Sequence, residues 1–216
     1  MKIDIEEPWL LADLGRRQQV LSFAPYRAGF VEADRIAIRQ VRNVDLSPEL
    51  DVSAWLAAQM QAIKAEAVAM LTSRGVAHFQ RAFFGVADCV ATVGLGNAER
   101  VGHRRAVRRA GYGTINIILR LDAGLTQTAM IEALTMVAQA RTAAVLEAGI
   151  HVPAGLATGT GTDCIALACD KGREEYAGSH TGLGEAIGRA TYDAVLAGVR
   201  AWIASHGDTP SDVLPE

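Results

Sequence analysis

The sequence has few cysteines, no long apolar run and no strong excess of charge of either sign. Its three cysteines, Cys89, Cys164 and Cys169, are an odd number in apolar settings, so we expect buried, reduced thiols rather than a disulfide framework. No apolar stretch approaches the roughly 18 residues of a membrane span, and the acidic start MKIDIEEPW lacks the regions of a signal peptide. The formal net charge of -3 argues against a general nucleic-acid binder. These absences predict a cytoplasmic protein that contacts neither membrane nor nucleic acid.

Familiar enzyme motifs are also missing. The chain has neither the H-E-x-x-H motif nor the C-x-x-C pair of common zinc sites. A nucleophile elbow around Ser179 would need glycine where Ala177 stands, and the third glycine of a dinucleotide fingerprint that begins at Gly94 would fall at Glu99. A metal held by Asp163, His180 and a distant residue has no spacing that indicates it. The sequence therefore leaves any metal or cofactor requirement unassigned.

The patterns that are present predict a single domain. With 216 residues, half of them hydrophobic, the chain is long enough to bury a substantial core. No internal repeat and no linker divides it. We expect one domain over residues 1–205, followed by a flexible tail over residues 206–216 with few apolar anchors. The oligomeric state stays open between a monomer and a homo-oligomer.

Hydrophobic periodicity predicts an α/β or α+β fold, in which a mixed β-sheet is packed by about three long helices. Apolar positions that recur every three or four residues indicate the helices, and alternating or continuous apolar runs indicate the strands. Thr126 is typical of a helix N-cap, and Gly149 of a helix end. The first expected helix has its start at Ser47–Glu49, shows the helical period from Ser53 to Met70 and ends before Gly75. The other two span Thr126–Glu147 and Thr181–Ala204. The expected strands lie within residues 1–44, on either side of Asp88, and at Thr114–Leu119 and Cys164–Cys169.

The stretch from Ala157 to Val195 holds most of the groups that could perform chemistry. It opens with the glycine-rich turn Gly159-Thr160-Gly161-Thr162-Asp163, where two glycines let the backbone approach a ligand beside hydroxyls and a carboxylate. A buried strand over Cys164–Cys169 follows. The long helix after it begins at Ser179-His180-Thr181.

Four blocks of this sequence together resemble the adenosylcobinamide amidohydrolase family. They are the segments Thr92–Ala98 and Gly113–Leu119, the run ATGTGTD with the small apolar residues after it, and YAGSHTGLGEAIGRATYDAV. In order, they span about residues 92–195, roughly half of the chain. The resemblance implies a corrinoid salvage enzyme, which hydrolyses the amide between the cobyric acid part of adenosylcobinamide and its aminopropanol arm. It implies a small-molecule corrinoid substrate and does not assign the mechanism.

Amide hydrolysis needs a nucleophile, donors for the developing oxyanion and an acid for the leaving amine. His180 is the best acid or base by residue type, and Asp163 would orient it as the third member of a triad does. Exposed amides of the Gly159–Gly161 turn are candidate oxyanion donors. The candidate catalytic residues are His180, Asp163, Thr162 and Ser179.

Each candidate has a structural alternative. Ser179 and Thr181 also fit as helix caps, Asp163 as a turn residue that binds its own backbone, and His180 as a structural histidine. Asn97 either ends a strand in a tight turn or contacts the amide groups of the substrate, and a buried Asn116 must bind either a neighbouring loop or the pocket. The candidate substrate-binding residues are Asn97, Asn116, Thr158, Gly159, Thr160, Gly161 and Thr181.

Two other functions compete with hydrolysis. One is a corrinoid-binding carrier without catalytic activity. The other is a phosphate-handling enzyme that uses the glycine turns as anion cradles and the arginine-rich run Arg100–Arg109 as a partner. That run is otherwise typical of a solvated loop or helix face.

Overall fold

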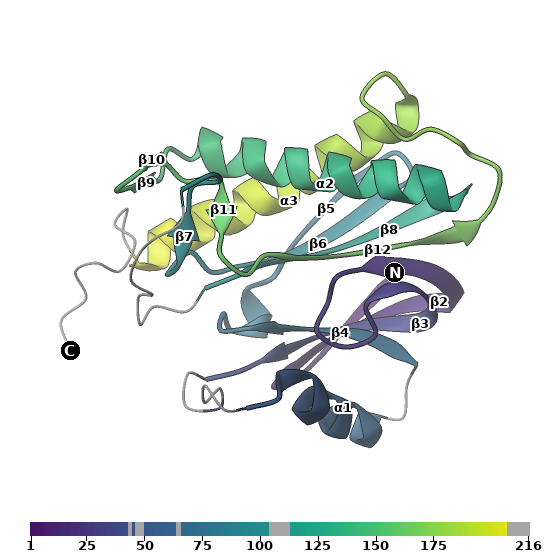
Figure 1. The fold of residues 1–216 in the computed structure, drawn as a ribbon, viewed down its shortest axis with the longest axis horizontal. Coiled ribbons are helices and arrows are strands. Elements are labelled where there is room, and N and C mark those ends of the chain that lie inside the picture. Colours follow the sequence, from purple (N-terminus) through teal and green to yellow (C-terminus); the bar gives the residue numbers. More distant parts are fainter. Residues whose placement is uncertain (43–44, 46–49, 64–65, 104–112, 207–216) are drawn as a thin grey trace.

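The computed structural model describes residues 1–42, 45, 50–63, 66–103 and 113–206 (Figure 1). Its main element is an eight-stranded mixed sheet in the order β4-β3-β2-β12-β8-β6-β5, with β1 on β2. Three helices pack against it, so the predicted mixed sheet with three helices is confirmed. The strands are β1 (Lys2–Glu6), β2 (Trp9–Ser22), β3 (Gly29–Gln40), β4 (Ala67–Thr72), β5 (Gln80–Phe84), β6 (Ala87–Val93), β8 (Ile115–Leu125) and β12 (Cys164–Lys171), and the helices are α1 (Val52–Ile63), α2 (Gln127–Glu147) and α3 (Gly182–His206).

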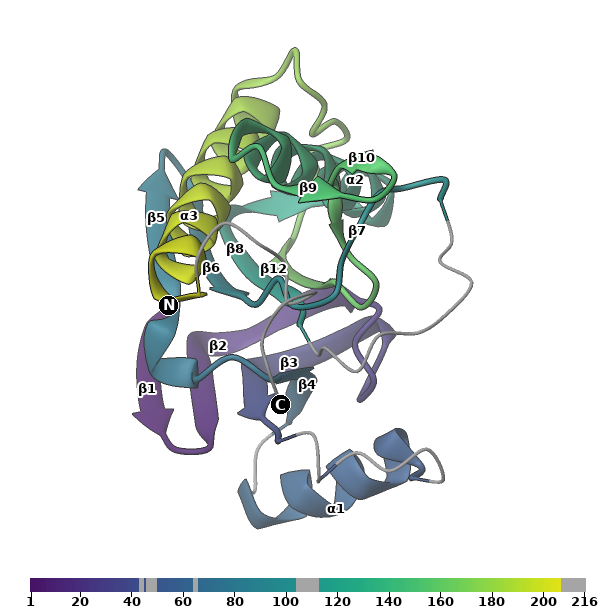
Figure 2. The same cartoon turned by 90° about the vertical axis from the view of Figure 1, so that its left-hand side faces the viewer.

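The sheet is strongly bent, so that its two halves lie over one another (Figures 1 and 2). Helices α2 and α3 cover the outer face of β6, β8 and β12, and α1 covers the outer face of β2, β3 and β4. The inner faces of both halves share a third apolar cluster. Strand β2 runs through both halves, and its pairing with β3 shifts between Asp13 and Gln18, where Gly15 adopts a φ of +78°. A bulge of this kind bends a strand, which lets one sheet supply two layers.

The two long helices begin and end where the sequence predicts. The Thr126 side chain caps α2 by accepting from the Ala129 amide at 3.2 Å, and Gly149 follows the helix with a φ of +70°. Thr181 caps α3 by accepting from the Gly184 amide at 2.8 Å. Helix α3 runs to His206, one residue into the predicted tail; the remaining residues 207–216 lie outside the described part of the chain.

Helix α2 is, by length and composition, apolar enough to cross a membrane. A core helix has the same profile. The residues of α2 that pack on the sheet and on α3 include Met130, Val137 and Ala144, all of them fully buried.

The helix predicted from Ser53 to just before Gly75 is wrong in its second half. Leu56 and Met60 lie on α1 and are buried, but the helix ends at Ile63 and Ala67–Thr72 forms β4, which runs parallel to β3. Four of these strand residues are buried on two faces: Val68 and Met70 join the inner cluster, and Ala67 and Ala69 pack against α1. Their spacing continued the helical period by coincidence. The predicted start at Ser47–Glu49 lies outside the described residues. A second difference concerns Asp88, which lies within β6 and not between two strands as predicted.

Asp88 forms a buried ionic contact that ties β6 to β5 and β1. Its carboxylate accepts from Arg81 Nε at 2.9 Å and Nη2 at 2.8 Å, and from the amino-terminal ammonium of Met1 at 2.8 Å. Burial alone raises the pKa of Asp88, but the hydrogen bonds from Arg81 and from the ammonium group lower it by more. The net result is a pKa below the ordinary value of an aspartate.

We expect Asp88→Asn to lower the free energy of unfolding at pH 7 by about 2 kcal/mol, because Arg81 would lose its buried partner. Since the folded pKa lies below the unfolded value of about 3.9, this stabilisation is complete above that pH and is lost as the pH falls through the folded pKa. Urea unfolding from pH 7 to pH 2.5 measures the effect. The exposed Asp122→Asn is the control, and an unchanged pH slope in Asp88→Asn would contradict the assignment.

Candidate functional site

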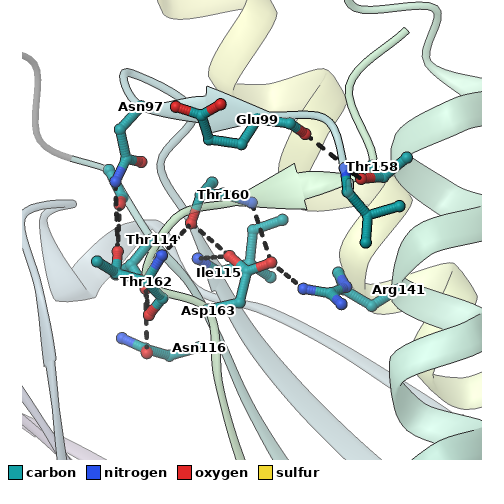
Figure 3. Close-up of polar contacts among 12 residues, drawn as sticks. Asn97, Glu99, Thr114, Ile115, Asn116, Arg141, Thr158, Thr160, Thr162 and Asp163 are labelled. Atoms are coloured by element: carbon teal, nitrogen blue, oxygen red, sulfur yellow. Dashed lines mark hydrogen bonds and ion pairs between the residues drawn. The ribbon is translucent and has the colours of Figure 1, made fainter. Parts of the chain in front are cut away.

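The Asp163 carboxylate lies directly before β12 and joins three separate parts of the chain (Figure 3). Its Oδ1 accepts from the Ile115 amide at 3.0 Å and from the Thr160 hydroxyl. Its Oδ2 accepts from the Thr160 amide at 3.0 Å and from the Arg141 guanidinium. The side chain is 8% exposed. An ionised carboxylate has about four acceptor positions, and these four donors fill them.

This arrangement follows from how the elements pack. Strands β12 and β8 are parallel neighbours that start at the same end of the sheet, so the residue before β12 lies beside the first amide of β8. The glycine turn forms a short strand, β11 (Gly159–Thr160), which pairs with β7 (Ala98–Glu99) above the same edge. Asp163 therefore acts first as the turn residue that the sequence allowed as one alternative, bonded to its own backbone at Thr160.

Arg141 is a site residue that the sequence analysis missed. It lies in the second half of α2, a helix for which the sequence suggested no chemistry, and its side chain is 18% exposed. It is the only basic residue between Gln127 and Glu147. A lone arginine in an alanine-rich helix was the available indication, because such a charge is rarely buried without a partner.

The threonine hydroxyls around Asp163 hold the loops together. Thr162 Oγ1 donates to the Gly113 carbonyl at 2.8 Å and accepts from Asn97 Nδ2 at 3.3 Å. Thr158 Oγ1 accepts from the Val101 amide at 2.8 Å. Thr114 Oγ1 donates to the Thr162 carbonyl at 2.8 Å. The glycine turn, the segment after β6 and the start of β8 thus form one polar network.

The two asparagines of the predicted site differ in position. Asn116 is buried on the inner face of the sheet and donates to the Leu71 carbonyl of β4 at 2.6 Å, which joins the two halves of the bent sheet. Of the two partners that the sequence allowed for Asn116, the structure shows the neighbouring segment. Asn97 lies at the rim of the turn, and its buried Oδ1 has no hydrogen-bond partner among the described residues. Asn97 therefore remains a candidate for contact with a ligand amide.

A pocket of about 580 Å³ opens beside the turn. Arg141, Asp163 and Thr160 form its polar end, and Gly161 also lines it. Its other walls are mostly apolar. They are made by Phe23, Leu134, Ala138 and Ile165, with Thr135 and Gln139 beside them. An apolar pocket with a few convergent polar groups is the usual form of a small-molecule site.

Glu99 lies on the other side of the glycine turn. Glu99 pairs with Gly159 where β7 and β11 run side by side. The Cγ of Glu99 is 3.8 Å from the position that a Cβ on Gly161 would take. In Figure 3 its carboxylate is turned toward Asn97. The sequence analysis noted Glu99 only as the position where a fingerprint glycine is absent.

The structure does not bring Ser179, His180 and Thr181 to Asp163. They lie beyond the far end of β12, at the start of α3, and Ser179 and His180 are exposed (Figure 1). Their loop is held to α2 by Glu132, whose Oε2 accepts from the Ala177 amide at 2.6 Å. Nine residues, or about 13 Å of helix, separate Glu132 from Arg141, which binds Asp163. Because all four acceptor positions of Asp163 are filled, Asp163 does not orient His180 here.

The cysteines, the possible metal ligands and the arginine-rich run complete the set of polar side chains that the sequence singled out. All three cysteines are free and buried, as predicted, and burial raises the pKa of Cys89 and Cys164 to about 12 and that of Cys169 to about 11. The described residues contain no group of three or more His, Cys, Asp or Glu side chains placed to hold a metal ion. Arg100 donates to the Leu156 carbonyl at 3.1 Å, whereas the rest of the run Arg100–Arg109, from residue 104, lies outside the described chain.

The geometry of the turn predicts that alanine is tolerated at one of its two glycines and not at the other. A Cβ at Gly159 would overlap Asp163 Oδ2 and lie 2.8 Å from Arg141 Nη1, whereas a Cβ at Gly161 would meet nothing closer than 3.8 Å. We expect Gly159→Ala to lower the free energy of unfolding by about 2 kcal/mol and Gly161→Ala to change it by less than about 0.5 kcal/mol. Denaturant unfolding of both variants measures this, and equal effects would mean that the turn has another shape.

Comparison with known proteins identifies relatives of this chain. A family model described as adenosylcobinamide amidohydrolase matches residues 1–207. An adenosylcobinamide amidohydrolase of Halobacterium salinarum is 30% identical over 162 residues, 71% of this chain and 68% of the relative. One of Methanosarcina mazei is 28% identical over 162 residues, 70% of this chain and 73% of the relative. An uncharacterized protein of Methanocaldococcus jannaschii is 38% identical over 96 residues, which are 43% of this chain and only 38% of that relative.

No solved structure matches this chain. The family match, in contrast, covers nearly all of it and extends well beyond the four blocks in which the sequence showed the resemblance. The chain therefore belongs to the adenosylcobinamide amidohydrolase family.

Proposed function

We propose that this protein hydrolyses the amide of adenosylcobinamide to give adenosylcobyric acid and aminopropanol, as a step of corrinoid salvage in the cytoplasm. Family membership supports the amidohydrolase class. The observation that carries the site is the pocket of about 580 Å³ that ends on the glycine turn, Arg141 and Asp163. Three free, buried cysteines accord with a reducing compartment.

In this proposal Asp163 and Arg141 are positioning residues. All acceptor positions of Asp163 are in use, so it can take a proton from water only by giving up a partner. Their role is to hold the backbone of the glycine turn in place. A fixed turn matters because oxyanion stabilisation depends on donors that are already oriented.

The exposed amides of the turn are the proposed oxyanion donors. The Gly161 amide reaches the Asn97 carbonyl at 3.4 Å, and the Thr162 amide reaches Thr160 Oγ1 at 3.4 Å. Both bonds are at the weak end of the range for N–H donors. A substrate oxygen can therefore replace either partner at little cost.

Glu99 is the proposed general base. As water attacks the amide carbon, the Glu99 carboxylate takes its proton, and the turn amides bind the oxygen that becomes negative. The protonated Glu99 then gives the proton to the amide nitrogen, the C–N bond breaks, and aminopropanol leaves. One carboxylate can serve as base and then as acid in this way. Thr162, exposed beside Gly161, is the alternative nucleophile in the same place.

The start of α3 is the second candidate for the catalytic group. Ser179 and His180 are adjacent and exposed in a loop that Glu132 fixes, so a hydroxyl and an imidazole are both available to a ligand. We favour the Asp163 end because the pocket of about 580 Å³ opens there, beside the glycine turn whose amides are the proposed oxyanion donors.

We expect Glu99→Gln to lower kcat for adenosylcobinamide by about 10²- to 10⁴-fold with little change in KM, because it removes the proton acceptor and keeps the shape. Formation of cobyric acid and aminopropanol, followed by mass spectrometry, measures the rate. Glu147→Gln, at the exposed end of α2, is the matched control.

His180→Asn and Ser179→Ala distinguish the two ends of the sheet in the same assay. We expect both to keep kcat within about threefold of the wild type. A large loss in His180→Asn together with an active Glu99→Gln would move the catalytic group to the start of α3. Binding of the corrinoid without product would instead identify a carrier, and binding of simple nucleotides alone would support a phosphate-handling enzyme.

A further inference from the structure

Three large apolar side chains are exposed beside helix α2, on the same side as the proposed active site. Phe23 and Phe30, at the turn between β2 and β3, are 52% and 41% exposed, and Ile131 of α2 is 53% exposed. A single exposed apolar residue is ordinary, but a group of them marks a binding surface.

Strand register places the two phenylalanines on the outer face of the sheet, next to α2. Phe30 pairs with Leu21, and Leu21 pairs with Leu167 in the core beneath α2 and α3. Paired residues of an antiparallel ladder share a face, so Phe30 lies on the helix side. Phe23 follows β2 and lines the pocket that contains Asp163.

A second pocket continues the first along α2. It has a volume of about 570 Å³, and it is lined by Gln19, Phe30, Gln127, Lys171 and Gly172 among others. Gln19 lies on β2, four residues before Phe23, which follows the strand, and four extended residues span about 13 Å. The two pockets therefore lie one after the other beside the β2–β3 hairpin.

One stripe of α2 faces both pockets. Gln127 lines the second pocket, Leu134, Ala138 and Arg141 line the first, and Ile131 lies between them in sequence. Steps of four, three, four and three residues keep all five side chains on one side of the helix. We call this surface the α2 groove; it is bounded by Phe23, Phe30, Gln127, Ile131, Leu134 and Arg141.

We propose that the α2 groove is the subsite for the ring of a large, planar, carboxamide-rimmed macrocycle, whose amide-linked arm reaches the glycine turn. This inference rests on the proposed function and adds where the ring lies. Phe23, Phe30 and Ile131 offer apolar surface to the face of the ring. Gln127 and Gln139 supply side-chain amides that can donate to and accept from carboxamides at its rim. Gln19 can only accept there, because its Nε2 already donates to the Leu125 carbonyl at 2.8 Å and to the Asp170 carbonyl at 2.9 Å.

The size of the pockets favours this placement. The pocket at the glycine turn is in the range of sites that enclose a drug-sized ligand, and a corrin ring with its side chains is larger than such a ligand. The arm fits at the turn, so the ring must rest on an adjoining surface. Phe23 and Leu134 belong both to that pocket and to the α2 groove, and Ile131 lies on the same side of α2, between the residues that line the two pockets.

The test uses Phe23→Ser, Phe30→Ser and Ile131→Gln in the full chain, with Phe83→Ser as the matched control. Phe83 is 63% exposed on the edge strand β5, away from the groove. Equilibrium dialysis measures binding of adenosylcobinamide and of cobyric acid, which keeps the ring and lacks the arm. We expect each groove variant to bind both compounds about tenfold more weakly and to raise KM with little change in kcat, and Phe83→Ser to behave as wild type. Thermal unfolding confirms that each variant is folded.

The outcomes separate this inference from the proposed function. If wild type forms product and the folded groove variants bind both corrinoids normally, the ring lies elsewhere and the α2 groove is overturned, while hydrolysis stands. If wild type binds neither corrinoid, both proposals fail. If wild type binds cobyric acid through the groove and forms no product, the groove stands and hydrolysis fails.

Discussion

The shape of the glycine turn depends on one carboxylate. Asp163 binds the first amide of β8, the amide and hydroxyl of its own turn, and a guanidinium on α2, so it fixes three parts of the chain that are far apart in sequence. The polar end of the pocket exists because these contacts meet there. The same contacts explain Gly159, where no atom larger than hydrogen fits between Asp163 and Arg141. Removing one partner of such a buried pair leaves the other uncompensated, so the turn tolerates little change at its centre.

The parts of this fold that the sequence predicted depend on short-range chemistry. Thr126 and Thr181 satisfy the first amides of α2 and α3, and Gly149 takes the positive φ that ends α2, so the helix ends follow from single residues. The β12 strand follows from an apolar run that alternates between two cores: Cys164 packs in the inner cluster and Cys169 beneath the helices. The family resemblance added the reaction class, which no local pattern contains.

What the sequence did not predict depends on distance through space. Ser179 and His180 follow Asp163 closely in sequence, but the eight residues of β12 carry the chain about 26 Å, from one end of the strand to the other. Arg141 is 22 residues from Asp163 and contacts it, because α2 returns along the strand. The bent sheet has the same effect on Asn116, whose partner Leu71 is remote in sequence and lies on a strand that resembled a helix. Helical periodicity could not separate α1 from β4, since a strand buried on both faces has no polar positions to break the pattern.

Helix α2 connects the two ends of the molecule. Glu132 and Arg141 are two and a half turns apart and so point to opposite flanks of α2, where one holds the loop before α3 and the other holds the glycine turn. The α2 groove follows the Arg141 flank, and about 21 Å of rigid helix separates Gln127 from Arg141. A ring held along this length would present its arm to the turn at a fixed distance. Binding energy gained from the ring would then orient an amide that has no recognition features of its own, as remote contacts do in enzymes that act on one part of a large substrate. On this proposal, a small amide without the ring would reach the same turn with nothing to orient it, so the selectivity of an exposed site would come from contacts remote from the reacting bond.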